Sequence, residues 1–199
     1  VGSGVRLTSN GGDIALTATG QASHSGVGVR LRANTSAAGL NEATALITSG
    51  AGTITISGQG GGVSDTTNAG VRIGSEDAGD VSSVLLQTAG GDLSITGTGG
   101  LWNADSATEL TQVAGVDLRS GTYRTTAGGA ITVSGTGPTG LAAPANTGYG
   151  DRDGVVIENH VLIDTYVAND SALAGDYGAI SITGTAYGTG EGIDGNDDT

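Results

Sequence analysis

Two aspartates in a glycine-rich, loop-like segment are the residues whose type and spacing best suit chemistry. Asp151 and Asp153 flank an arginine and precede a glycine. Calcium takes about six to eight oxygen ligands, and aspartates that cluster in loops supply several of them. The pair is therefore the best candidate calcium site in the chain. The alternative is that these carboxylates only keep an acidic surface solvated, and the sequence leaves both interpretations open.

Three aromatic residues are candidate interaction residues because they lie in the variable, polar segments of the chain. They are Trp102, Tyr149 and Tyr187. An aromatic ring in such a loop stacks on a sugar or on a neighbouring molecule, or it folds back over the edge of the core. Both possibilities stay open.

Composition excludes several classes of function. The 199 residues include 20 Asp and Glu against 7 Lys and Arg, which gives a formal charge of -13. The chain therefore lacks the basic surface that nucleic-acid binding requires. It contains no cysteine, so disulfides and thiolate metal sites are excluded, and no apolar stretch approaches the ~18 residues of a membrane-spanning helix. Because Val1 is not an initiator Met, we expect a processed product or a piece of a longer chain.

A glycine-led motif, motif a, recurs five times at intervals of about 40 residues, a period typical of solenoids. It reads glycine, any residue, aliphatic, small, aliphatic, Ser or Thr, and then glycine. The alternation of apolar and small polar residues predicts a strand. The copies begin at Gly12, Gly52, Gly91, Gly129 and Gly178.

Two further apolar motifs lie between the copies of motif a. Motif b is Gly-Val-x-Leu or Ile, and its copies begin at Gly4, Gly28, Gly70, Gly115 and Gly154. Motif c is a weaker apolar stretch before each motif a, and it merges with Leu7 in the first copy. The other copies of motif c are marked by Leu46-Ile47, Leu85-Leu86, Tyr123 and Leu173.

Three short strands repeated every ~40 residues predict the coils of a right-handed parallel β-helix. We expect about five coils in one β-solenoid domain, residues 1–199, with repeats starting near residues 4, 28, 70, 115 and 154. Neighbouring coils would bury each other's aliphatic columns, as no single coil buries its own. Two alternatives stay open: two coils of about 20 residues per repeat, or an antiparallel β-sandwich.

The ends of this solenoid carry no recognisable capping segment. An open end exposes apolar columns and unpaired strand backbone. We therefore expect the end coils to meet flanking repeats of a longer chain, or other copies of the chain stacked end to end.

The repeats resemble those of large bacterial surface and secreted proteins of the filamentous-haemagglutinin-like β-helical adhesin type. Motif a copies such as Gly52–Gly58 and motif b copies such as Gly70–Ile73 carry the resemblance, which covers essentially the whole chain. It implies an exported, extended protein that serves in adhesion, matrix building or surface coating. The resemblance brings no catalytic residues.

The outward positions of motif a are expected to form a face rich in Ser and Thr. A hydroxyl ladder on an exposed sheet is one interpretation, and the face also resembles the T-x-T surface of ice-binding β-solenoids. The face comprises Thr55, Ser57, Ser94, Thr96, Thr132, Ser134, Ser181 and Thr183, with Ala15 and Thr17 in the first copy.

Motif b predicts an outward column of Arg6, Arg30, Arg72 and Asp117. This column is either a solvated, partly paired face or a site for acidic glycans, against which the net charge argues.

Catalysis is not expected. Polysaccharide-cleaving β-helices need acidic residues together on outward strand positions, and these positions here hold Ser, Thr and Ala. His24 and His160 fall in different repeats and in no nucleophile motif.

The sequence therefore predicts a structural or adhesive repeat segment of an extracellular bacterial surface or fibre-forming protein, such as a stalk, matrix filament or adhesin spacer. Expected partners are copies of itself or flanking repeats, and also glycans, but neither nucleic acid nor a membrane span. No cofactor is required, with calcium the one candidate. The alternatives are a carbohydrate- or calcium-binding module that uses the long loops, and ice binding through the Ser/Thr face.

Overall fold

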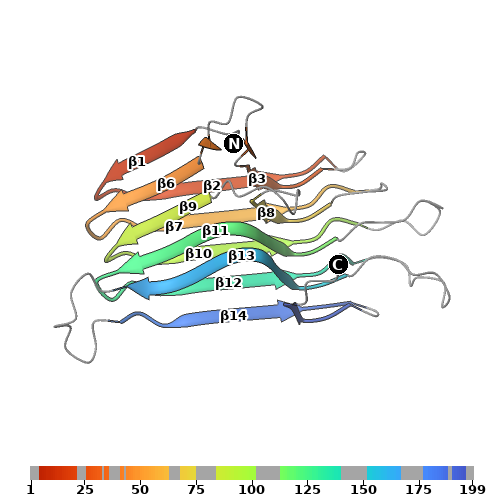
Figure 1. Ribbon diagram of the computed structural model, residues 1–199. Helices are drawn as coiled ribbons and strands as arrows, with labels where there is room; N and C mark the ends of the chain where they lie inside the picture. Colours follow the sequence, from red (N-terminus) through yellow and green to blue (C-terminus); the bar gives the residue numbers. More distant parts are fainter. Residues whose placement is uncertain are drawn as a thin grey trace.

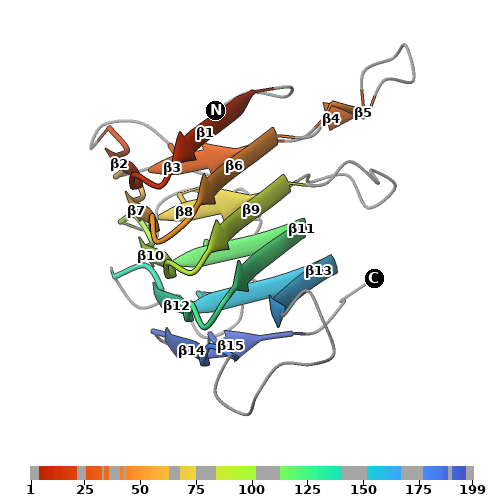
Figure 2. The ribbon, with the colours of Figure 1, turned by 90° about the vertical axis from the view of Figure 1, so that its left-hand side faces the viewer.

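The protein is a stack of parallel β-coils without a helix in the residues that the structure describes (Figure 1). This computed structural model describes residues 5–21, 26–32, 34–35, 41–42, 44–62, 68–74, 84–101, 113–139, 152–166, 177–187 and 190–195. The strands form three ladders, which we name a, b and c after the motifs that supply them. Figure 2 shows how the rungs of the ladders lie above one another along the stack.

Ladder a is a parallel sheet in which each strand is one copy of motif a. Equivalent residues pair on every rung, so that Ile54 lies beside Leu93 and Leu93 beside Ile131. This register confirms the predicted columns. The strands are β2 (Ile14–Thr19), β7 (Ile54–Gln59), β10 (Leu93–Thr98), β12 (Ile131–Thr136) and β14 (Ile180–Thr185).

Ladders b and c belong to a second parallel sheet, because in two coils their strands join into one. The joined strands are β11 (Val116–Thr126) and β13 (Val155–Tyr166). The remaining b strands are β3 (Val29–Leu31), β8 (Val71–Ile73) and β15 (Ile193–Asp194). The remaining c strands are β1 (Arg6–Asn10), β6 (Thr44–Ser49) and β9 (Val84–Ala89).

The parallel pairing decides between the alternatives that the sequence left open. Each a strand pairs with the a strand about 40 residues away, which two shorter coils per repeat would not allow. An antiparallel sandwich is excluded because the ladders of both large sheets are parallel. The described antiparallel pair is the short hairpin of β4 (Asn34–Thr35) and β5 (Asn41–Glu42), between β3 and β6.

Three details of the predicted coils are wrong. The copy of motif b at residues 4–7 is a c strand, because Leu7 pairs with Leu46. The last c strand is the second half of β13, where Ile163 pairs with Tyr123, whereas Leu173 lies outside the described residues. The described chain therefore starts in ladder c and finishes in ladder b, and it forms fewer complete coils than five.

The core is a set of aliphatic columns between the two sheets. Motif a supplies two columns, and the b and c strands supply residues such as Val71, Ile73 and Leu86, all of them buried. Each coil thus covers the apolar side of the next, and this burial is the main stabilising contribution of a solenoid.

In one coil, a glycine and a tyrosine occupy positions in adjacent columns that hold valine and leucine in the neighbouring coil. Tyr123 occupies the column of Leu46 and Leu86, while Gly121 lies between Val84 and Val161 in the next column. A Cβ on Gly121 would lie 3.0 Å from the Tyr123 hydroxyl oxygen. The large phenol therefore uses the space that the glycine leaves. Burial raises the pKa of Tyr123, and in the described structure its hydroxyl has no hydrogen-bond partner.

The corner from ladder c to ladder a is a tight turn with a buried threonine. Thr48 donates a hydrogen bond from its hydroxyl to the carbonyl oxygen of Gly52 at 2.7 Å, and Thr125 does so to Gly129 at 2.5 Å. These bonds satisfy carbonyls that the turn would otherwise leave without a partner. The corner glycines touch from coil to coil, since a Cβ on Gly91 would lie 2.1 Å from the Gly52 oxygen.

Aspartates at the start of ladder a link neighbouring coils. Asp13 Oδ1 accepts hydrogen bonds from the Thr53 backbone N–H at 2.8 Å and from its hydroxyl at 3.0 Å. These bonds lower the pKa of Asp13, since they favour the charged carboxylate. Asp92 accepts the same backbone bond from Ala130, at 2.8 Å.

Candidate functional site

The outer side of ladder a carries the hydroxyl face that the sequence predicts. Thr55 lies beside Ser94, and Ser94 beside Thr132, in one column. Of the predicted residues, Thr55, Thr96, Thr132, Ser181 and Thr183 are exposed, and Ser57, Ser94 and Ser134 are half-buried. These residues therefore lie in two aligned columns on ladder a. The ice-binding interpretation of this face stays a prediction, which thermal hysteresis and the shape of ice crystals would check.

A third polar column extends this face, and sequence reasoning missed it. It consists of Thr19, Gln59, Thr98, Thr136 and Thr185. The signal was present, because each of these residues follows the position of the second motif glycine. With this column, each strand of ladder a presents three outward positions, nearly all of which are Ser or Thr.

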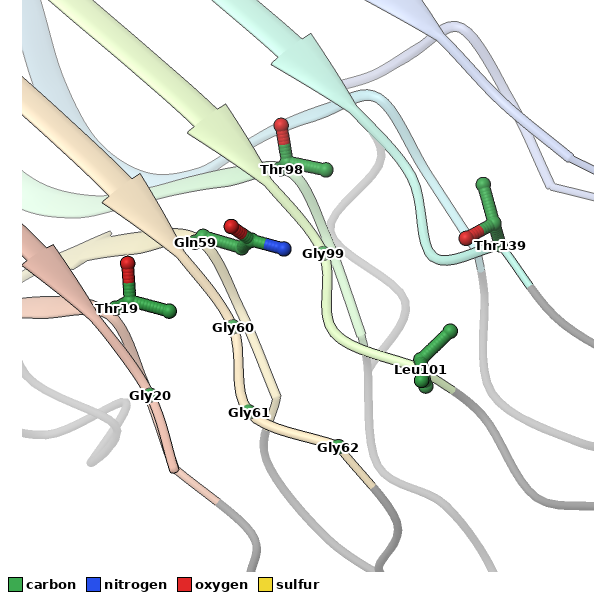
Figure 3. Close-up of a pocket in the computed structure, with 10 residues that line it drawn as sticks. All are labelled: Thr19, Gly20, Gln59, Gly60, Gly61, Gly62, Thr98, Gly99, Leu101 and Thr139. Carbon is green, nitrogen blue, oxygen red and sulfur yellow. The ribbon is translucent and has the colours of Figure 1, made fainter. Parts of the chain in front are cut away.

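A small pocket opens at the end of the third column (Figure 3). Its volume is about 140 Å³, and its polar side chains come from Thr19, Gln59, Thr98 and Thr139. The segments that follow β7 and β10 are glycines at Gly60 and Gly99, so much of the wall is backbone. Leu101 lines the pocket with a side chain that is 54% exposed. The pocket thus combines uncharged polar groups with one apolar contact.

The arginine column of ladder b is aligned as predicted, but it is not solvated. Arg30 pairs with Arg72, and Arg72 with Asp117. Arg72 is 2% exposed and Asp117 is fully buried, although both alternate with the residues that face the core. Arg6 is not part of this column, because it lies in ladder c beside Ala45.

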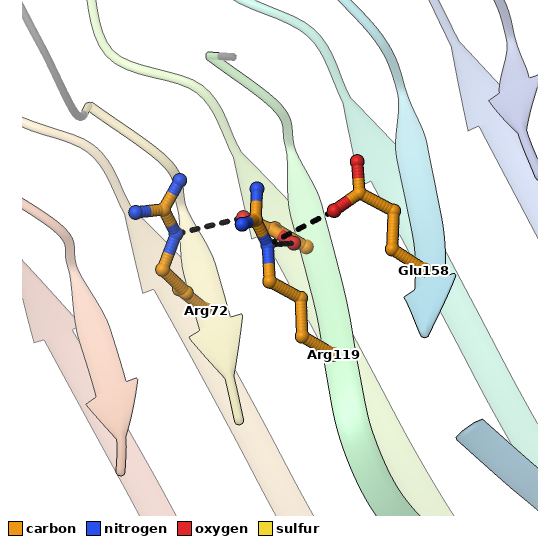
Figure 4. Close-up of polar contacts among 4 residues, drawn as sticks. Arg72, Arg119 and Glu158 are labelled. Carbon is orange, nitrogen blue, oxygen red and sulfur yellow. Dashed lines mark hydrogen bonds and ion pairs between the residues drawn. The ribbon is translucent and has the colours of Figure 1, made fainter. Parts of the chain in front are cut away.

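Buried ion pairs join three strands in this region (Figure 4). Arg72 Nε donates to Asp117 Oδ2 at 2.7 Å, and Arg119 Nε donates to Asp117 Oδ1 at 2.9 Å. Arg119 Nε also lies 3.3 Å from Glu158 Oε2. The Asp117 carboxylate therefore accepts from two guanidinium groups, which offsets the cost of burying its charge. Such closed pairing gives the network a structural role rather than that of an anion-binding face.

One of the two candidate calcium ligands already has a structural contact. Asp153 is buried, and its Oδ1 accepts a hydrogen bond from the Glu191 backbone N–H of the next coil at 2.6 Å. Burial lowers the pKa of its neighbour Arg152. Asp151 lies outside the described residues, among which no group of three or more potential metal-ligating side chains occurs. Calcium binding by this pair stays a prediction.

Of the three candidate aromatic residues, the structure describes Tyr187. Its side chain is 43% exposed beyond the end of β14. Trp102 and Tyr149 lie outside the described residues. Their role as interaction residues stays a prediction. His160 is exposed on β13, and His24 lies outside the described residues.

The fold, rather than similarity to a known protein, indicates the class of this protein. No protein-family model matches the chain, and neither does any curated protein or solved structure. The stacked parallel coils define the protein as a β-solenoid, an architecture that it shares with β-helical proteins. In the described ranges, no helix is long and apolar enough to cross a membrane.

Proposed function

We propose that the protein is a structural or adhesive repeat segment of an extracellular bacterial surface or fibre-forming protein. It would act as a stalk, a matrix filament or the spacer of an adhesin. The observation that carries the proposal is the unbroken register of ladder a, in which every rung repeats the same contacts. A structure that grows by identical rungs lengthens without a new core, as a spacer requires.

The chemistry of the surface supports this proposal. The outward side of ladder a presents small hydroxyl side chains, and the chain as a whole carries a formal charge of -13. Acidic surfaces favour solubility and reduce non-specific association. Five rungs at about 4.8 Å each give a rod segment about 24 Å long.

Immunogold electron microscopy of intact cells that produce the protein tests the proposal. An antibody against the folded chain should label the outer surface or extracellular filaments. Label that appears only after the cells are permeabilised would contradict the proposal.

A second candidate function is the binding of a neutral glycan in the pocket of Figure 3. The pocket supports it because threonine hydroxyls and the Gln59 amide offer donors and acceptors for sugar hydroxyls, while Leu101 offers an apolar contact. The segment around Trp102, which lies outside the described residues, is the alternative location of a glycan site.

Retention of the purified chain on immobilised neutral polysaccharides separates these locations. Gln59→Ala should abolish retention if the pocket binds, whereas Trp102→Ala should do so if the loop binds. Thr132→Ala is the matched control on the same sheet, outside the pocket, and circular dichroism verifies the fold. Full retention by both Gln59→Ala and Trp102→Ala would exclude both locations.

A further inference from the structure

The N-terminal end of the stack contains a hollow. It lies between β2 and β3, has a volume of about 320 Å³, and is lined by residues that include Leu16, Ala18, Val29 and Arg30. In the described structure β2 has a strand neighbour on one side, β7, and β3 has one, β8. The hollow is thus bordered by two strand edges and combines apolar side chains with one cation.

The C-terminal end presents isoleucines instead. Ile180 on β14 and Ile193 on β15 are each 46% exposed, although their columns are buried in the middle of the stack. Within the described residues, β14 and β15 likewise have a strand neighbour on one side. Apolar side chains beside free strand edges form a template for a further rung.

The two ends match when the ladders are extended by one rung. Ladder a would place Ile180 beside Ile14 and Ile182 beside Leu16, which continues both aliphatic columns. Ladder b would place Ile193 beside Val29, at the hollow. Ladder c would place Ile163 of β13 beside Leu7 of β1. All three ladders therefore continue in a single register.

The charges at the two ends of the stack are also complementary in this register. The b column that contains Arg30, Arg72 and Asp117 also contains Asp194, which is the last described residue of that column. Within the stack this column pairs Arg72 with Asp117 on adjacent rungs at 2.7 Å. Extension by one rung brings Asp194 beside Arg30, an opposite-charge pair of the same type.

We propose that the C-terminal end of one copy stacks in register on the N-terminal end of a second copy, with Asp194 against Arg30. This inference deepens the fibre-forming function proposed above and rests on it. The contact joins two different surfaces and does not close, so repeated stacking produces a filament rather than a ring.

Charge-swap variants test the register. Sedimentation velocity and negative-stain electron microscopy of the native chain across concentration should show oligomers that grow into filaments. Arg30→Asp places two acidic residues at the contact, and Asp194→Arg places two arginines there. Each variant alone should raise the concentration needed for assembly at least tenfold. An equimolar mixture of the two should assemble again as alternating filaments, because each contact between unlike variants joins opposite charges.

Matched controls separate this contact from general effects of charge and folding. Thr96→Arg adds a positive charge to β10, the middle strand of ladder a, away from both ends, and should leave assembly unchanged. Ile193→Asp should block assembly at the apolar part of the contact. Circular dichroism and thermal unfolding verify that each variant folds.

Two results would overturn the inference. One is a native chain that stays monomeric at every concentration, and the other is a mixture that assembles no better than its components. Either result would leave the spacer function standing if immunogold labels the cell surface. Label confined to permeabilised cells would remove that function whatever the chain does in solution.

Discussion

Ladder a and the sheet of ladders b and c use the same stacking but differ in regularity. Each strand of ladder a has six residues, and its register runs without a shift. Strands of the other sheet vary from 2 to 12 residues. The register of β11 shifts between Arg119 and Gly121, and Ser120 there has a φ of 38°. The hairpin of β4 and β5 enters between β3 and β6.

The difference lies partly in how closely the backbone packs along ladder a. Where ladder a meets ladders c and b, backbone touches backbone at glycines, so no side chain fits at these points, although the segments that connect the ladders differ in length. A Cβ on Gly97 would lie 2.0 Å from the Gly115 oxygen. At the corner from b to c, a Cβ on Gly74 would overlap the backbone carbonyl group of Arg119 on β11, and β11 accommodates a bulge directly after this contact. Side-chain pairing also stabilises that sheet.

The largest expected effect is the loss of a buried charge partner in the b and c sheet. Asp117→Ala leaves Arg72 and Arg119 without this carboxylate, which should lower the free energy of unfolding by about 3–5 kcal/mol. Asp164→Ala is the matched control, because its pair with Arg124 at 2.7 Å is partly exposed and should contribute only about 1 kcal/mol. Chemical denaturation measures both. Equal effects would mean that the buried pairs do not stabilise the sheet.

The close contact at the corner from a to b should be nearly as sensitive. Gly97→Ala should cost about 3 kcal/mol, because the new methyl group overlaps the backbone of Gly115. Gly195→Ala is the control, since a Cβ there meets no atom within 4 Å. A native denaturation midpoint for Gly97→Ala would contradict the role given to glycine corners.

Much of this comparison could be predicted from the sequence, and the errors have physical causes. The columns of ladder a follow from alternation and period, because Ile54, Leu93 and Ile131 occupy the same place in their motifs. Gly4–Leu7 and Gly28–Leu31 have the same letters, so the local pattern does not distinguish a c strand from a b strand. The short distance to the next motif a distinguishes them, because the four residues between Leu7 and Gly12 leave no room for another strand.

The candidate site was predicted less completely than the fold. The exposed Ser/Thr columns depend on strand alternation, which is local. The burial of Arg72 and Asp117 depends on what lies over their column, and local alternation does not report this. The pocket at Gln59 requires the end of ladder a to lie beside Leu101, a proximity that follows only from the stacked coils.

The exchange of volume at Tyr123 sharpens the comparison within ladder c. Tyr123→Leu should leave a cavity and cost about 2 kcal/mol, and Gly121→Val should crowd the phenol and cost about 2 kcal/mol. The double variant has valine and leucine at these positions, as the neighbouring rung does at Val84 and Leu86. Its loss of stability should therefore be smaller than the sum of the two single losses by about 1–2 kcal/mol. Strict additivity in urea denaturation would show that the two positions do not share space.

Insertions should produce the smallest effect where the coil already varies. Three residues, Gly-Ser-Gly, inserted after Arg119 should cost only about 1 kcal/mol, because this corner already holds a bulge. The same insertion between Gly90 and Gly91 separates corner glycines that touch the next coil, and it should cost more, about 3 kcal/mol. Equal tolerance at both places would contradict the distinction between the corners.

The stacking of ladder a is tested most directly by distances between spin labels on one column. Ala15, Thr132 and Ser181 are exposed residues of the same column, and the chain contains no cysteine that would interfere with labelling. Cysteines at Ala15 and Thr132 should give labels about 14 Å apart, and those at Ala15 and Ser181 about 19 Å, one rung of ~4.8 Å further. A second distance equal to or shorter than the first would contradict the parallel stack.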